Sequence, residues 1–305
     1  MNKQSILSKA LELLNKGKSQ RQIAKELSVA RSTLGDWLRG DKQEGMQVIN
    51  RPKTLLIDVE TACAVVATFG RFKQNIGQDN VIEEGGFILT YTAKWLGDDL
   101  LINNHIKNKR DDYEMVKEIA ELLDEADVVI AHNLTQFDSK MIKTRMLYHG
   151  MKPVTPFKEY DTLSVAKDVF RFPSNKLDSL GEYLEIGRKK SHSGIKLWLN
   201  VMNLEKEAIA EMMEYNDQDV ILLEQLYEKI APWSRKFPSI APMYDDGKKH
   251  CPICGSTHLD EMSKTTFTQQ SEFAMYRCSS CGKVARGKEN LRSKESMKNT
   301  LMSVV

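Results

Sequence analysis

Two carboxylates interrupt a mostly apolar segment, TLLIDVET, at residues 54–61. The segment reads as a β-strand, in which side chains alternate between two faces. Asp58 and Glu60 then follow Leu56 on one face, about 7 Å from each other along the strand. Two such carboxylates repel each other and are costly to bury. A divalent cation would compensate, because hard cations prefer carboxylate oxygens; a strand end at which both side chains reach water is the alternative.

Another carboxylate follows the apolar segment ADVVIAHN. The predicted strand runs into Asn133, and Asp138 falls in the first turn of the helix expected next. An acid at a helix N-terminus complements the helix dipole, which would explain Asp138 without any chemistry. The His-Asn pair, its four-residue spacing to Phe-Asp and the apolar strand before it keep a functional role open.

The stretch EYNDQDVILLEQLY, residues 214–227, carries two aspartates on one predicted helix. At about 100° per residue, Asp219 lies about 40° from Tyr215, inside the apolar stripe formed by Met212 and the leucines. Asp217 lies about 200° away, beside Glu224, and is expected to face solvent. An aspartate inside a core stripe is costly unless it is paired. Asp219 is therefore the candidate functional residue.

Two Cys-x-x-Cys pairs near the C-terminus predict a metal site. The pairs occur in HCPICGSTH and YRCSSCGKVARGK, and each is followed by Gly. Four thiolates in this arrangement suit a closed, tetrahedral, structural Zn²⁺ site, and the segment looks like a zinc ribbon. His250 and His258 lie nearby, but four thiolates already complete the shell. Cys63 is expected to be a buried apolar filler. The predicted ligands are Cys251, Cys254, Cys278 and Cys281.

The N-terminal residues have the rhythm of a helix-turn-helix. QRQIAKELSVARSTLGDWLRG places Ile23, Ala24 and Leu27 on an inner face and a tight turn at Ser28-Val29. The second helix would then begin at Arg31, Ser32 and Thr33, where recognition helices contact the major groove. The segment resembles helix-turn-helix domains of resolvases and bacterial regulators. A helical protein-interaction module is the alternative.

The elements that would position these residues predict an α/β core between two small modules. Strands come first, and strands alternating with helices follow, which is typical of a mixed sheet with helices on its faces. We expect strands in CAVVATFGRF, GGFILTYTAKWLG and DDLLINNH, and a mostly helical region over 161–231. Linkers and proline-rich breaks divide the chain into four predicted parts. These are an all-α module at 1–45, the core at 54–231, the ribbon at 247–290 and a basic, loose tail at 291–305.

The charge distribution favours a polyanionic partner. The 305 residues carry a formal net charge of +2, but residues 1–53 carry +6, residues 247–305 carry +5 and the region between them carries −9. Basic ends attract a polyanion, and an acidic centre would need cations to handle one. Solvated surface charge is the alternative. Without a signal peptide or a membrane-spanning run, we expect no membrane association and a cytoplasmic protein, near the nucleoid or in the host cytoplasm of a virus.

Together, the three acidic motifs resemble those of the DEDD family of 3′–5′ exonucleases, which have a ribonuclease H-like fold. The resemblance covers roughly 54–231 and rests on Asp-x-Glu in LLIDVET, on HNLTQFDSK and on Tyr-x-x-x-Asp in YNDQD. Tyr215 lies four residues before Asp219, as in the tyrosine variant of the family. EYDTLSVAKDV and NKLDSLGEYLEIGRKK also look like segments of exonuclease domains related to family-B DNA polymerases. The apolar TACAVVATFG after Glu60 departs from the family's usual Thr-Gly turn.

The resemblance implies a ligand set and a chemistry. Asp58, Glu60, Asp138 and Asp219 would hold two Mg²⁺ or Mn²⁺ ions, which activate a water and stabilise the departing 3′ oxygen. Tyr215 would orient the attacking water, since an unperturbed pKa near 10 makes it a poor base. Asn133 would support the metals or the substrate strand indirectly, by positioning the groups that contact them.

The sequence thus predicts a metal-dependent 3′–5′ exonuclease that acts on single-stranded DNA ends, with duplex DNA held by the helix-turn-helix. RNA is the alternative substrate, because the chemistry does not read the 2′-hydroxyl. Replication or repair proteins are candidate partners. A transposon-type ribonuclease H-like endonuclease is one alternative, although the ribbon here follows the last aspartate instead of interrupting the core. A non-catalytic DNA-binding regulator is another.

Overall fold

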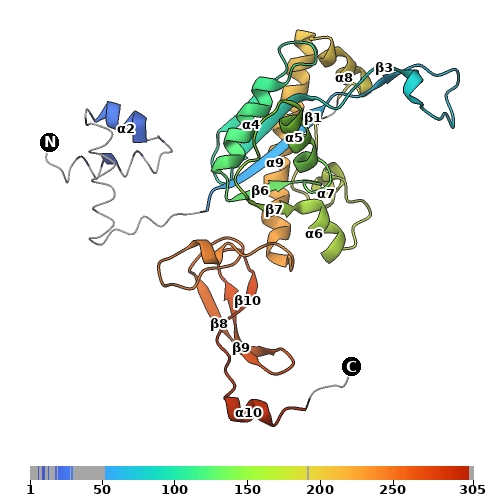
Figure 1. Cartoon of the computed structure of the whole chain (residues 1–305). Coiled ribbons are helices and arrows are strands. Elements are labelled where there is room, and N and C mark those ends of the chain that lie inside the picture. The colour runs from blue at the N-terminus through green and yellow to red at the C-terminus, as the bar shows by residue number, and fades with distance from the viewer. Residues whose placement is uncertain are drawn as a thin grey trace. The chain divides into compact units, whose positions relative to one another are not determined.

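The computed structural model describes residues 52–190 and 192–301 and, before them, residues 20–27 with Ile6, Lys9, Ala10, Leu13, Lys18 and Val29. Contacts divide the chain into two units (Figure 1). One comprises Met1–Asn50 with Asp245–Gly247, and the other comprises Arg51–Tyr244 with Lys248–Val305. The larger unit holds the acidic motifs and the cysteines. Among the described residues, no helix has the length and apolar character that crossing a membrane requires.

A five-stranded mixed sheet forms the centre of the larger unit, in the order β5-β4-β1-β6-β7. The central strand β1 pairs antiparallel with β4 and parallel with β6. β4 pairs antiparallel with β5, and β6 pairs parallel with β7. The predicted mixed α/β fold is therefore confirmed. The strands are β1 (Thr54–Thr61), β4 (Ile88–Trp95), β5 (Leu101–His105), β6 (Val128–Ala131) and β7 (Lys158–Asp161).

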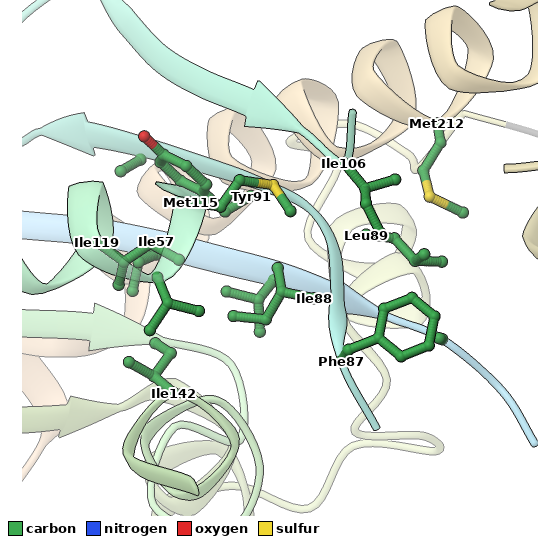
Figure 2. Packing of buried hydrophobic residues seen from close by; sticks show 14 of the residues in the cluster. Ile57, Phe87, Ile88, Leu89, Tyr91, Ile106, Met115, Ile119, Ile142 and Met212 are labelled. Carbon is green, nitrogen blue, oxygen red and sulfur yellow. The ribbon is translucent and has the colours of Figure 1, made fainter. Parts of the chain in front are cut away.

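Helices cover both faces of this sheet, because β1 is apolar on each face near its start. Leu55, Ile57 and Val59 pack in a core with buried side chains of α4 (Tyr113–Glu125) and α5 (Asp138–Tyr148). Figure 2 shows Ile57, Ile119 and Ile142 together in this core. On the opposite face, Leu56 packs with Val220 and Leu223 of α9 (Lys206–Ile230). The alternation predicted for β1 is confirmed, so Asp58 and Glu60 belong to the α9 face.

The region 161–231 is mostly helical, as expected. It contains α6 (Thr162–Val169), α7 (Leu177–Tyr183), α8 (Ile195–Met202) and α9, followed by the 3₁₀ turn η3 (Ala231–Trp233). α9 is long because its stripe of buried residues continues from Ala208 to Ile230. It contributes Met212 to the α4/α5 core and Leu226 to a third cluster with Leu180 of α7. One helix therefore ties the layers of the domain together.

The prediction that CAVVATFGRF forms a strand of this sheet is wrong for most of its length. Only β2 (Val65–Val66) is extended there, and it pairs with β3 (Val81–Glu83) in a separate two-stranded arm. A 3₁₀ turn, η2 (Gln78–Asn80), precedes β3. The apolar run lacks the alternation of a half-buried strand and Gly70 interrupts it, so no sheet face could bury it.

In the smaller unit, the structure describes the helix α2 (Gln20–Glu26). Ile23 and Ala24 are buried against Ala10, and Leu27 packs beside them. These are the residues predicted to form the inner face of the first helix of a helix-turn-helix. Arg31, Ser32 and Thr33, the predicted DNA-contacting residues, lie outside the described residues, so their role stays a prediction.

The C-terminal part contains a three-stranded antiparallel sheet in the order β10-β9-β8. Its strands are β8 (Leu259–Phe267), β9 (Glu272–Cys278) and β10 (Val284–Arg286), and α10 (Lys294–Lys298) follows them. The 3₁₀ turn η4 (Ala241–Met243) precedes the sheet. Phe237, between α9 and this sheet, stacks on Tyr160 of β7 with ring centroids 4.3 Å apart. The connection is thus anchored to the central sheet.

A buried ion pair fixes α5 against the sheet, and it generates the first prediction. Asp112 accepts hydrogen bonds from the Ile88 amide at 2.8 Å and from Arg145 Nε at 2.8 Å and Nη2 at 2.7 Å. Replacing Asp112 with alanine leaves Arg145 buried without its partner, a defect that costs about 3–5 kcal/mol. We expect urea denaturation to show a loss of that size. Glu114→Ala, at an exposed position nearby, should change the stability by less than about 1 kcal/mol.

Candidate metal and active site

Three of the predicted carboxylates meet in one place. Oxygen atoms of Asp58, Glu60 and Asp219 all lie within 4.8 Å of one another. Asp58 and Glu60 come from β1, and Asp219 comes from the middle of α9, where its side chain is fully buried. The strand and the helix are far apart in the sequence, so the packing of α9 on the sheet creates the cluster.

Asp138 approaches the same cluster from α5. It is 2% exposed, and its Oδ1 accepts a hydrogen bond from the Val59 amide at 3.3 Å. That amide lies between Asp58 and Glu60 in the chain, so the bond holds Asp138 beside the two β1 carboxylates. The position at the start of α5 also agrees with the dipole interpretation. Asp138 can therefore both belong to the carboxylate cluster and complement the dipole of α5.

A polar seam between β4 and α9 sets the position of Asp219. Thr90, Thr92 and Lys94 alternate on the buried α9 face of β4, and each contacts a polar residue of the helix. Thr90 Oγ1 lies 3.5 Å from Asn216 Oδ1, Thr92 Oγ1 donates to Asp217 Oδ1 at 2.7 Å, and Lys94 pairs with Glu224. The seam therefore fixes which turn of α9 faces the carboxylates of β1.

The expectation that Asp217 faces solvent is wrong. Its carboxylate accepts hydrogen bonds from Thr92 and from Asn103 Nδ2, the latter at 2.8 and 3.0 Å. The helical wheel placed Asp217 opposite the apolar stripe correctly, but α9 lies flat on the sheet and that side of the helix faces β4 and β5. Asp217 thus holds the helix in place, and Asp219 is the aspartate that enters the cluster.

Asn216 orients Asp58, and the sequence reasoning did not select it. The fully buried Asn216 donates from Nδ2 to Asp58 Oδ2 at 2.6 Å. On the helical wheel it lies about 100° from Tyr215, next to the apolar stripe. A buried amide beside a buried carboxylate was the signal that could have identified it.

Lys189 is the second residue that the sequence reasoning missed. Its Nζ forms an ion pair with Asp219 Oδ2 and donates to the Tyr215 hydroxyl at 3.0 Å. It precedes α8 in the basic run Arg188–Lys190, which resembles a solvated loop when read from sequence alone. In the structure its ammonium group supplies a positive charge to the carboxylate cluster. The predicted neighbours Tyr215 and Asp219 do lie together, one helical turn apart on α9.

The pKa values of all four carboxylates are raised, because burial and mutual repulsion outweigh the nearby positive charge. Burial, reinforced by Asp219, raises the pKa of Asp58 to about 7. Burial also raises the pKa of Glu60 and of Asp138 well above the usual range, and Asp58 reinforces both shifts. Burial raises the pKa of Asp219 too, although Lys189 acts in the opposite direction. Lys189 alone does not offset the repulsion among these groups.

The residues present fit divalent metal binding. Among the described residues, Asp219 Oδ1 is a buried oxygen with no hydrogen-bond partner. Such an oxygen is costly unless something binds it. Lys189 donates to the other oxygen of Asp219, Oδ2, and the nearby carboxylates of Asp58 and Glu60 cannot donate when ionised. Hard cations take oxygen ligands of this kind, and several carboxylates around one point suit Mg²⁺ or Mn²⁺ better than softer metals. The donor set therefore agrees with the ions predicted from sequence, whose identity stays a prediction.

Tyr215 is held in a defined orientation beside the carboxylates. Its ring is 7% exposed and packs edge-on against His192, with ring centroids 5.0 Å apart. Burial and the neighbouring Asp219 raise its pKa to about 12. The hydroxyl therefore keeps its proton at neutral pH. Tyr215 can position a water or a phosphate oxygen by a hydrogen bond, and it cannot act as a strong base.

An open hollow of about 610 Å³ borders the cluster and shares Lys189 and Tyr215 with it. Three of the six lining residues are cationic, and each forms an ion pair: Arg188 with Glu182, Lys189 with Asp219 and Lys190 with Glu214. A hollow of this size can admit a phosphate-bearing group next to the carboxylates. The lining residues are Asp178, Arg188, Lys189, Lys190, His192 and Tyr215.

Asn133 lies in the turn between β6 and α5, in the left-handed conformation with φ of 80°. Its backbone amide donates to Asp161 Oδ1 at 3.1 Å, and Asp161 also caps α6 through the amides of Leu163 and Ser164. Asp161 therefore holds the turn that leads to Asp138. A contact between Asn133 and metal or nucleic acid stays a prediction.

The four C-terminal cysteines form a second cluster. Their sulfur atoms lie within 4.8 Å of one another, and the Cys251–Cys281 and Cys254–Cys278 pairs are each 3.6 Å apart. A disulfide requires about 2.05 Å. Four sulfurs bound tetrahedrally to one Zn²⁺ at about 2.3 Å lie about 3.8 Å apart, so the cluster fits zinc. His250 instead donates from Nδ1 to the Gly255 carbonyl at 2.7 Å.

The cysteine cluster predicts the metal content of the protein. Cys278→Ser removes one of two fully or nearly fully buried ligands, and we expect bound zinc to fall from about one ion per chain to well below one. Elemental analysis by mass spectrometry after dialysis measures this. Cys63→Ser is the matched control, because Cys63 lies beside Met202 and outside the cluster. Equal zinc content in both variants would contradict the assignment.

The carboxylate cluster predicts an unusual effect on stability. Because the folded-state pKa of Asp58 is raised from 3.8 to about 7, the protein without Mg²⁺ or Mn²⁺ should lose stability as the pH rises from about 4 to about 7. Asp58→Asn removes one of the repelling charges and keeps the shape. At pH 8 we expect this variant to melt at a higher temperature than the unchanged protein when neither ion is added.

Thermal unfolding with zinc retained checks this expectation. Adding Mn²⁺ should raise the melting temperature of the unchanged protein and raise that of Asp58→Asn much less, since only bound ligand stabilises. Glu228→Gln, at an exposed position of α9, should behave like the unchanged protein. A lower melting temperature for metal-free Asp58→Asn would show that the four carboxylates do not repel one another as described.

The comparison with protein families agrees with this fold. Residues 89–231 match the RNase_H superfamily. Among solved structures, the chain is similar to the family B DNA polymerase from the hyperthermophilic archaeon Pyrobaculum calidifontis, at 16% identity and a TM-score of 0.47. That match covers 59% of this chain and 25% of the polymerase, so the chain spans only about a quarter of that protein. A comparison with curated proteins gave no match. Residues 89–231 are therefore similar to the RNase_H superfamily, and the five-stranded mixed sheet with helices on both faces is consistent with a ribonuclease H-like fold.

Proposed function

We propose that the protein is a metal-dependent 3′–5′ exonuclease that removes nucleotides from single-stranded nucleic acid ends, with DNA as the preferred substrate. The observation that carries the proposal is the convergence of oxygen atoms of Asp58, Glu60 and Asp219, together with Asp219 Oδ1, which is buried and has no hydrogen-bond partner among the described residues. Asp138 joins them through the Val59 amide. Ribonuclease H-like nucleases depend on metal ions, and this donor set suits two ions that share carboxylate ligands.

Side chains of the protein would position the metal ligands, orient the attacking water and bind the phosphate. When bound, the ions would supply a water of lowered pKa and stabilise the charge on the leaving oxygen. Asn216 holds Asp58 by its Oδ2 and so leaves the other oxygen of that carboxylate available. Lys189 fixes the Tyr215 hydroxyl, and Tyr215 orients the attacking water by a hydrogen bond. The cationic side chains of the hollow bind the phosphate next to the scissile bond.

Two features support an exonuclease over an endonuclease of the transposon type. Tyr215 precedes Asp219 by one turn on the same helix and contacts the same lysine, which gives the cluster a water-orienting group. The cysteine cluster follows α9 and leaves the carboxylate-bearing elements uninterrupted. A non-catalytic regulator is disfavoured, because such a protein would bear the cost of four crowded carboxylates without benefit.

Cleavage assays with single-stranded DNA labelled at the 3′ or the 5′ end test the proposal. In Mg²⁺ or Mn²⁺ we expect stepwise shortening from the 3′ end. Asp219→Asn removes a metal ligand and should reduce kcat/KM by on the order of 10³-fold, a loss equivalent to about 4 kcal/mol of transition-state stabilisation. Glu228→Gln, at an exposed position about two and a half turns along the same helix, should retain full activity.

The other outcomes separate the alternatives. Internal cuts would indicate an endonuclease, and strand binding without hydrolysis would indicate a regulator. Loss of activity in Glu228→Gln as well as in Asp219→Asn would mean that α9 is merely perturbed. RNA with the same sequence and labels decides the sugar preference, because faster shortening of RNA would reverse the assignment of DNA.

A further inference from the structure

The connection between β1 and β4 is far longer than its geometry requires. The two strands are antiparallel neighbours, which usually need a turn of about 2–5 residues, yet the chain runs through residues 62–87 between them. This segment, called the arm below, projects from the domain in Figure 1, where β3 marks it. Loops much longer than about 12–15 residues in a compact domain usually serve a function.

The arm is a built structure with a narrow root. The Ala62 amide donates to the Phe87 carbonyl, and the Gly86 amide donates to the Ala62 carbonyl, both at 2.9 Å. At Gly85 any side chain would collide with the backbone of Ala62 at 2.5 Å, so the two strands of the root pass in close contact. Beyond β2 and β3, the Ala67 amide donates to the Asn80 carbonyl at 2.9 Å. These bonds continue the structure from β1 out to the tip.

The tip, residues 68–77, exposes large aromatic side chains. Phe69 is fully exposed and Phe72 is 85% exposed. Aromatic rings usually contribute to cores or to binding surfaces, and exposing two of them three residues apart is costly. The tip is also internally bonded, since Thr68 Oγ1 donates to the Gly70 carbonyl at 2.9 Å and Gln74 Nε2 to the Phe72 carbonyl at 2.8 Å. The rings are therefore presented on a formed loop.

Charge identifies the partner of the tip. Arg71 and Lys73 are exposed and alternate with the two phenylalanines, and the sequence of the tip contains no acidic residue. The arm has three acidic residues outside the tip. Asp79 lies in η2 directly after the tip, and nearer the root Glu83 pairs with Arg110 at 3.2 Å and Glu84 accepts from Gln78 at 2.9 Å. Alternating aromatic and cationic side chains are the chemistry that binds single-stranded nucleic acid, by stacking on bases and by pairing with phosphates.

We propose that the tip of the arm binds the substrate strand several nucleotides away from the end that is cleaved. Phe69 and Phe72 stack on unpaired bases, and Arg71 and Lys73 contact the adjacent phosphates. The inference rests on the proposed function, because it assigns the tip to the same strand whose end lies at the carboxylates. The arm follows directly after β1, the strand that carries Asp58 and Glu60. The tip is therefore connected to the carboxylate cluster through β1 and the arm.

The length of the arm predicts which substrates use it. From Glu60 to Phe69 the chain spans at most about 30 Å when extended. A stacked nucleic-acid strand advances about 3.4 Å per nucleotide, so a strand of four nucleotides covers only about 14 Å. Such a strand can occupy the carboxylate cluster without reaching a fully extended tip, whereas a strand of 30 nucleotides can reach both.

Fluorescence anisotropy with the full-length protein tests the proposal. A 5′-fluorescein-labelled DNA strand of 30 nucleotides is titrated without Mg²⁺ or Mn²⁺, so that no cleavage occurs. We expect Phe69→Ala/Phe72→Ala to weaken its binding at least fivefold, since each base–aromatic stack is lost on truncation. Binding of a labelled strand of four nucleotides should be equally weak in both proteins. Tyr148→Ala, which removes another exposed aromatic, on α5, should leave both affinities unchanged.

The possible failures are distinguishable. Unchanged binding of the 30-nucleotide strand by the double variant would overturn the role of the tip, whether or not the protein cleaves DNA. An altered sedimentation coefficient with unchanged strand binding would also overturn it and would assign the tip to contacts between protein chains. Absence of cleavage in the unchanged protein would instead sink the proposed nuclease activity, while the difference in strand binding would still decide the inference about the arm.

Discussion

The repulsion among buried carboxylates is the constraint on which the rest of the domain depends. Asp58, Glu60, Asp138 and Asp219 come from β1, α5 and α9, and burial raises the pKa of each. Nothing about such a cluster favours folding by itself. The surrounding core must therefore supply the stability that the cluster costs, and apolar packing on both faces of β1 does so. Lys189 is the one nearby cation in the described structure that forms an ion pair with the cluster, and it pairs with Asp219 alone.

The polar seam between β4 and α9 solves a positioning problem that apolar packing leaves open. Apolar side chains define which face of a helix is buried, but they tolerate small shifts along the sheet. Hydrogen bonds from Thr90 and Thr92 to Asn216 and Asp217 tolerate such shifts poorly, because an unmade bond in a buried site costs about 1–3 kcal/mol. Asp219 is thereby held at a fixed turn of α9. By holding α9 in register with β4, the seam fixes the position of the Asp219 carboxylate relative to Asp58 and Glu60.

Much of the cluster was predictable from sequence because it follows from local periodicity. The alternation of β1 put Asp58 and Glu60 on one face, and the helical wheel separated Asp219 from Asp217 correctly. The helical wheel did not predict the contacts of Asp217. Periodicity shows which side of α9 a residue occupies, but it does not show that β4 and β5 cover that side. The polar alternation of Thr90, Thr92 and Lys94 in an otherwise apolar strand was the signal for this contact. Lys189 lay in a loop without period, so only the tertiary structure could bring it to Asp219.

The arm shows how an insertion can stand beside a demanding site without disturbing it. β1 and β4 keep their register opposite Asp58 and Glu60, with Thr92 and Thr90 as their respective partners. The register shifts only after Glu60, where the arm departs. Hydrogen bonds between Ala62, Gly86 and Phe87 close the root immediately beyond that point. These hydrogen bonds at the root separate strain or motion in the arm from Asp58 and Glu60. Changes in the sequence of the arm therefore need not disturb Asp58 and Glu60, because β1 stays paired with β4 up to Glu60.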